Sequence, residues 1–96
     1  RATEAPPVPL PGGATFQSGL ALSADGQTLY VADLAADALL ALETSTGAVR
    51  ARRALERGDR PGALRLSPDG KTLYAALWGR DRVLALAPAT LETRRA

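Results

Sequence analysis

The chain has 96 residues, a formal net charge of +2, and neither cysteine nor histidine. A chain of this length forms one small domain at most and buries only about 60–65% of the surface that it exposes when unfolded. The lack of cysteine excludes a disulfide framework, a thiolate nucleophile and any Cys-ligated metal. The lack of histidine removes the commonest general base and transition-metal ligand. The composition therefore predicts no metal, no cofactor and no catalytic residues in this chain.

The N-terminal segment, residues 1–17, is rich in proline and glycine and is interpreted as a connector. The longest uncharged run, residues 5–24, is interrupted by these residues, so it predicts neither a membrane-spanning helix nor the apolar region of a signal peptide. Methionine is absent, even at position 1. We therefore expect an incomplete piece of a longer protein, with no membrane segment.

An internal repeat organises the remaining residues. The segment Leu22–Tyr30 recurs as Leu66–Tyr74, an offset of 44 residues, and the alignment continues without a gap from residues 18–52 onto residues 62–96. Within each copy, Asp25-Gly26 and Asp69-Gly70 are dipeptides typical of tight hairpins, in which glycine supplies a positive φ. Each copy is predicted to form four short strands. The expected strands are residues 19–23, 28–32, 38–43 and 48–55, followed by 63–67, 72–76, 82–87 and 91–96.

Local propensity offers an alternative for part of this pattern. Residues 34–43 and 48–57 are rich in Ala, Leu, Glu and Arg, which favour helix. The second copy has Val83 within the corresponding strand and Pro88 directly after it, and both copies are expected to share one structure. The repeat therefore favours strands over helices.

A unit of four strands and 44 residues is typical of a β-propeller blade. We accordingly predict an all-β protein made of two four-stranded antiparallel blades of a partial β-propeller. The first blade spans residues 18–61 and the second spans residues 62–96, incomplete at its end.

The same residues resemble a known family. Tyr30–Asp33, which reads YVAD, follows the first hairpin and resembles the YVTN-type β-propeller repeat, and Ser67–Tyr74 is similar to its consensus; the second copy departs from it at Tyr74–Leu77. The segment Leu77–Gly79 resembles the Asn-Trp-Gly of YncE-like propellers found ahead of alkaline-phosphatase or phosphoesterase-type domains, with Leu in place of Asn. The resemblance covers residues 18–96. It implies a periplasmic or secreted location.

One group of residues is a candidate binding site. Trp78 and Arg80 lie in the loop between the second and third strands of the second copy, and Asp33 ends the second strand of the first copy. Trp, Arg and Asp together are typical of a binding hot spot. The alternative is that Trp78 packs between blades as a large apolar filler. Asp25, Gly26, Asp69 and Gly70 are interpreted as structural turn residues, because each Asp-Gly pair serves its own hairpin.

The charge distribution is uneven along the chain. Residues 1–49 carry a net charge of −4, and residues 50–96 carry a net charge of +6. Binding of nucleic acid is nevertheless not favoured, since no aromatic residues alternate with the arginines to stack on bases.

The predicted function is that of a non-catalytic scaffold or binding domain. Its partners are expected to be neighbouring blades of the same propeller and a protein or small-molecule ligand that the sequence does not identify. The alternative, implied by the resemblance, is the amino-terminal propeller of a larger phosphoesterase whose catalytic residues lie outside this chain.

Overall fold

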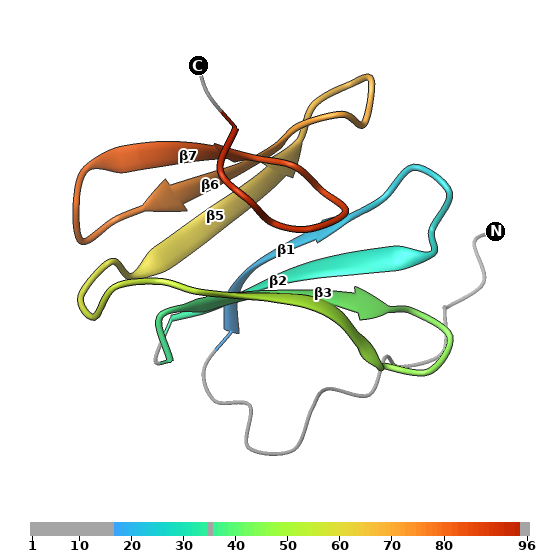
Figure 1. Cartoon of the computed structure of the whole chain (residues 1–96), viewed down its shortest axis with the longest axis horizontal. Helices are drawn as coiled ribbons and strands as arrows, with labels where there is room; N and C mark the ends of the chain where they lie inside the picture. The colour runs from blue at the N-terminus through green and yellow to red at the C-terminus, as the bar shows by residue number, and fades with distance from the viewer. Residues whose placement is uncertain (1–16, 35, 95–96) are drawn as a thin grey trace, which may run out of the picture.

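A computed structural model describes residues 17–34 and 36–94 of the chain, and these residues form two antiparallel β-sheets (Figure 1). The first sheet has four strands in the order β1-β2-β3-β4, and the second has three in the order β5-β6-β7. The strands of the first sheet are β1 (Gln17–Leu22), β2 (Thr28–Asp33), β3 (Ala38–Glu43) and β4 (Val49–Ala54). Those of the second are β5 (Pro61–Leu66), β6 (Leu73–Leu77) and β7 (Arg82–Leu86).

The all-β prediction is confirmed, and the helical alternative is excluded for the residues that the structure describes. The two segments with high helix propensity contain β3 and β4 instead. Pairing with neighbouring strands thus overrides local propensity. No helix in the described part of the chain is long and apolar enough to span a membrane.

The second sheet has one strand fewer than predicted. In place of a strand at residues 91–96, the described residues show a single bridge between Leu86 and Thr93, with backbone hydrogen bonds from Ala87 NH to Glu92 O at 2.8 Å and from Arg94 NH to Ala85 O at 2.7 Å. The prediction of eight strands was therefore wrong, because the described segment after the turn is too short to extend this pairing. The predicted connector, residues 1–17, lies outside the described residues except for Gln17, which begins β1.

The two Asp-Gly turns have closely matching geometry. Gly26 has a φ of 74° and Gly70 a φ of 73°, the positive values that the hairpin interpretation requires. Asp25 and Asp69 each accept a hydrogen bond at 2.6 Å from the Ser hydroxyl two residues earlier. Each also accepts one from the backbone NH two residues later. The Ser hydroxyl is the main cause that lowers the pKa of each carboxyl group.

One hydrophobic core lies between the two sheets. Side chains alternate between the faces of a strand, so one face of the first sheet presents Tyr30, Ala32, Leu39 and Ala41 to the second sheet. The second sheet meets them with a face rich in leucine, formed by Leu73, Ala75, Leu77, Leu84 and Leu86. A second buried cluster, of Val31, Leu40 and Leu42, lies on the opposite face of the first sheet.

The two copies of the repeat use opposite faces at this core. Tyr30 and Leu39 are 5% and 1% exposed in the core, whereas their counterparts at the 44-residue offset, Tyr74 and Val83, are 43% and 66% exposed on the far side of the second sheet. If a two-fold axis lay between the sheets, matching faces of the two copies would meet in the middle. The sheets are instead stacked in the same orientation, as successive units.

The sheets approach each other most closely at their first strands. A Cβ atom on Gly19 of β1 would overlap the carbonyl oxygen of Gly62 in β5, so the two backbones are in direct contact there. At the opposite edge a long side chain bridges the sheets: Arg53 of β4 donates hydrogen bonds to Leu91 O and Thr93 Oγ1, both at 2.9 Å. Backbone contact at β1 and β5, compared with contact through one long side chain at β4, indicates that the sheets lie closest together at their first strands. Figure 1 shows β5 next to β1.

Candidate functional site

Three loops meet at one end of the stacked sheets. They are the β2–β3 loop, the β4–β5 connection and the β6–β7 loop, and we call their described residues (34, 36–37, 55–60 and 78–81) the loop-end surface. Backbone hydrogen bonds from Trp78 NH to Arg60 O at 2.9 Å and from Gly79 NH to Asp59 O at 3.0 Å join two of these loops. A Cβ atom on Gly79 would overlap the carbonyl oxygen of Gly58, so this contact requires glycine.

Asp37 joins the third loop to the other two. Its Oδ1 accepts a hydrogen bond from the backbone NH of Arg60 at 2.7 Å, and its Oδ2 accepts one from the backbone NH of Gly58 at 2.9 Å. These hydrogen bonds, first that of Gly58 and then that of Arg60, lower the pKa of Asp37. Asp37, Gly58 and Arg60 all have positive φ, at 50°, 90° and 52°. The carboxylate therefore holds a strained backbone segment in one conformation.

Arg80 lies on the loop-end surface and forms an ion pair with Asp59, which was not among the contact residues predicted from the sequence. Its Nε is 2.9 Å from Oδ1 of Asp59, and its Nη2 donates to the carbonyl oxygen of Arg57 at 3.2 Å. Asp59 is buried and also accepts a hydrogen bond from Glu56 NH at 2.9 Å. The bond to Asp59 raises the pKa of Arg80. Arg80 thus fixes the connection, which limits its availability as a ligand contact.

Trp78 and Asp33 differ in their exposure to solvent. The indole of Trp78 lies over the backbone of Gly62, where a Cβ atom would overlap the ring, and the residue is 61% exposed. In this chain it is not a filler buried between the two sheets. Asp33 is buried at the end of β2 and its Oδ1 accepts a hydrogen bond from Ala36 NH at 3.1 Å. Of the three predicted contact residues, Trp78 and Arg80 are therefore exposed on one loop, and Asp33 is not.

A pocket of about 350 Å³ opens on the loop-end surface. It is lined by Leu34, Asp37, Arg57, Gly58 and Arg60. The Asp37 carboxylate is already engaged by two backbone NH groups, whereas Arg57 and Arg60 are exposed and form no ion pair with the residues that the structure describes. Guanidinium groups suit carboxylates and phosphates, so this pocket is equipped to bind an anionic group.

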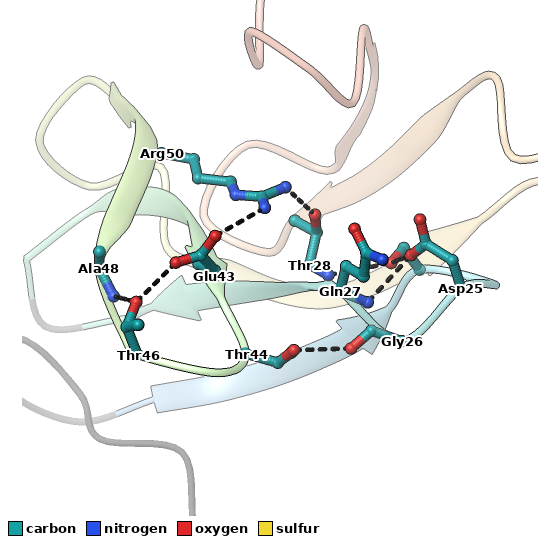
Figure 2. A network of polar contacts seen from close by, with 10 residues as sticks. Asp25, Gly26, Gln27, Thr28, Glu43, Thr44, Thr46, Ala48 and Arg50 are labelled. Carbon is teal, nitrogen blue, oxygen red and sulfur yellow. Dashed lines mark hydrogen bonds and ion pairs between the residues drawn. The ribbon is translucent and has the colours of Figure 1, made fainter.

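A second pocket, of about 320 Å³, lies beside the first hairpin, and its lining includes Asp25, Tyr30, Arg50 and Pro88. Its polar groups bond to one another (Figure 2). Arg50 donates to Thr28 Oγ1 at 2.9 Å and pairs with Glu43 Oε2 at 3.1 Å. The Thr46 hydroxyl and then Arg50 lower the pKa of Glu43, and burial raises the pKa of Tyr30. Arg50, Thr28 and Glu43 already have partners, so this network stabilises the hairpin and β4.

The contact residues predicted from the sequence did not include Asp37, Asp59, Arg57 or Arg60. Asp37 could have been found from the repeat, because Asp81 occupies its counterpart and has a φ of 51°, close to the 50° of Asp37. Asp59 belongs to an Arg-Gly-Asp tripeptide whose carboxylate is buried, and no local pattern predicts its pairing with Arg80. No group of three or more His, Cys, Asp or Glu residues that could hold a metal ion occurs among the residues described.

These features define an all-β chain of two stacked antiparallel sheets with a loop-end surface, and a solved structure shows a similar fold. It is a protein of Bacteroides uniformis described as a candidate 6-phosphogluconolactonase, with a TM-score of 0.69 and 22% sequence identity. The match covers 82% of this chain and 25% of that one, so the chain spans about a quarter of its neighbour's length. At this identity the likeness shows the fold alone.

Other comparisons correct the family resemblance. No known protein family matches the chain, and no curated protein matches it. The resemblance to the YVTN-type repeat and the YncE-like class was therefore wrong: a short hairpin motif and a Trp-Gly pair are too small to define a family. Two expectations rested only on that resemblance: the phosphoesterase alternative and the periplasmic or secreted location. Neither is now supported by a relationship to a known family.

Proposed function

We propose that this chain is a non-catalytic scaffold module whose two sheets are consecutive blades of a partial β-propeller, and that the scaffold presents the loop-end surface for binding. One observation carries the proposal: the two repeat copies stack in the same orientation, so the face buried in the first sheet is free in the second. Stacking of this kind makes each unit a platform for the next.

The spacing of the sheets supports the same interpretation. Blades radiate from a common axis, so their first strands lie close together and their outer strands lie apart. The Gly19–Gly62 backbone contact at β1 and β5 and the long Arg53 bridge at β4 follow this pattern.

The binding role rests on how the loop-end surface is built. Asp37 and Asp59 hold its backbone through hydrogen bonds and an ion pair, while the guanidinium groups of Arg57 and Arg60 line a pocket without an ion-pair partner among the described residues. We infer an anionic group, a carboxylate or a phosphate, as its ligand. Lactone hydrolysis is not proposed, because the match covers only 25% of the neighbour whose name describes that activity.

The scaffold role predicts that stability comes from the stack and not from the loops. Leu39→Ala removes a fully buried side chain at the interface and should destabilise the chain by about 2–4 kcal/mol. Its repeat counterpart Val83→Ala, on the free face, should change stability by at most about 0.5–1 kcal/mol, and the exposed pair Arg57→Ala/Arg60→Ala by about 0.5 kcal/mol. Urea unfolding followed by circular dichroism measures all three. Equal losses for Leu39→Ala and Val83→Ala would contradict the stacking direction.

The binding role is tested by titration of the ¹⁵N-labelled chain with inorganic phosphate and with gluconate. Shifts confined to the amides around Arg57–Arg60, and lost in Arg57→Ala/Arg60→Ala, are expected. Shifts spread evenly over the exposed arginines would show that the pocket does not recognise anions.

A further inference from the structure

We propose that a second copy of this chain docks head-to-tail on the first. The free face of the three-stranded sheet of one copy would receive the β1 side of the four-stranded sheet of the next. The inference rests on the stacking orientation used in the proposed function, and it names the partner of that stack.

The receiving surface is the free face of the second sheet. It carries Tyr74, Ala76, Val83 and Ala85, whose repeat counterparts form the first sheet's half of the core. Tyr74 and Val83 are exposed, and so is Arg65, which lies on the same face where the first copy has Ala21. The apolar side chains at these strand positions thus pack against a neighbouring sheet in the first copy, whereas Tyr74 and Val83 have no such sheet against them in the second.

The docking surface of the other copy is the outer side of β1. Leu20 and Leu22 are 61% and 56% exposed. Their counterparts in β5, Leu64 and Leu66, are partly buried and pack against the core between the sheets. The exposed docking surface therefore corresponds only to the β5 part of the internal interface, because Val31, Leu40 and Leu42, the counterparts of Ala75, Leu84 and Leu86, are buried.

This pairing favours a head-to-tail contact over a symmetric one. A symmetric dimer would place Tyr74 and Val83 against their own copies, an arrangement without a template in the structure. A head-to-tail interface leaves one free face at each end, so it either closes into a ring or continues as an open array. We therefore expect association to extend beyond a dimer as the concentration rises.

Two features make the external contact weaker than the internal one. Ala63 stands where Gly19 lies in the first copy, and a Cβ atom at Gly19 would overlap the facing backbone, so a docked copy cannot approach β5 as closely. In addition, Val31, Leu40 and Leu42 are buried, which confines the docking surface to the β1 side. Association in the micromolar to millimolar range is expected, detectable by sedimentation of concentrated samples.

Complementary variants test the contact. Leu20→Asp removes the docking surface and keeps the receiving face, whereas Val83→Asp does the reverse. Each variant alone should remain monomeric at concentrations at which the native chain associates, with affinity reduced at least tenfold. An equimolar mixture should form a 1:1 dimer and nothing larger, because one intact pair of surfaces remains. Ala89→Asp, at an exposed turn position outside both surfaces, is the matched control and should associate like the native chain.

Two outcomes for the unmodified surfaces would overturn the proposal: a native chain that stays monomeric at millimolar concentration, or loss of association in Ala89→Asp. Two outcomes for the variants would do the same. These are a mixture of Leu20→Asp and Val83→Asp that stays monomeric, and Leu20→Asp that still self-associates, which would indicate a symmetric contact. Circular dichroism checks that the variants fold, and Tyr74→Asp replaces Val83→Asp if the latter does not. Leu39→Ala reports on the internal stack separately. If it still destabilises the monomer while the mixture fails to pair, only the docking is wrong.

Discussion

Asp37 is the residue on which the geometry of the loop-end surface depends most directly. Its two carboxylate oxygens each accept a different backbone NH, of Gly58 and Arg60. An asparagine offers only one acceptor oxygen, and its amide nitrogen would face the other NH donor. Charge and shape at this position are therefore both required.

Asp37→Asn should destabilise the chain by about 1–2 kcal/mol at neutral pH through loss of a charge-assisted hydrogen bond. The pKa of Asp37 is lowered in the folded state. Its contribution is therefore complete above the ordinary pKa of an unfolded aspartate and is lost as the pH falls through the lowered folded-state pKa. The difference in unfolding free energy between the native chain and Asp37→Asn should shrink in that acidic range. Urea unfolding at a series of pH values measures this difference, and a constant difference would contradict the assignment.

Among the elements, the segment after β7 shows how one residue alters a repeat. In the first copy the turn before β4 ends at Gly47, with a φ of 77°, whereas the second copy has Leu91 there, with a φ of 65°. Leu91 is fully buried in the core between the sheets. Its side chain compensates for a backbone conformation that disfavours leucine.

This conflict predicts an unusual order of stability at position 91. Leu91→Ala loses the buried side chain and keeps the strained backbone, so it should cost about 3–4 kcal/mol. Leu91→Gly loses the same packing but relieves about 1 kcal/mol of strain, so it should be the more stable of the two variants. Urea unfolding of both proteins decides the order. If Leu91→Ala proved the more stable, the positive φ would not be a source of strain.

At the scale of the whole molecule, two different contacts connect the sheets. Close backbone contact joins them at β1 and β5, and the Arg53 side chain joins them at the outer edge. The outer contact consists of two hydrogen bonds from one long side chain, so it should open more readily than the direct backbone contact at β1 and β5.

Arg53→Ala should therefore release the outer edge without separating the sheets. Loss of two hydrogen bonds predicts a destabilisation of about 1–2 kcal/mol and faster amide hydrogen exchange at Thr93 and Arg94 than at Leu73 and Ala75. Arg52→Ala, at the neighbouring exposed position, is the control and should leave exchange unchanged. Uniformly faster exchange in Arg53→Ala would instead mean that the two sheets separate as a whole.

The sequence alone determined the features that depend on neighbouring residues. The Asp-Gly pairs define the two hairpins, because glycine at positions 26 and 70 takes the positive φ that the turn needs. The repeat predicted the order of the seven observed strands and favoured strand over helix for residues 38–43 and 49–54. The turns and the strand pattern within each copy depend on residues close together in the chain, so the local sequence predicts them.

The tertiary structure alone decided the features that join distant residues. The orientation of the stack, the contacts of Asp37 with Gly58 and Arg60, and the ion pair between Asp59 and Arg80 connect positions 21 to 23 residues apart along the chain or lie on different sheets. Strand alternation shows that a strand has two faces but not which neighbour covers each. That choice depends on the packing of whole sheets, and for this reason the buried Tyr30 and the exposed Tyr74 have nearly identical sequence surroundings.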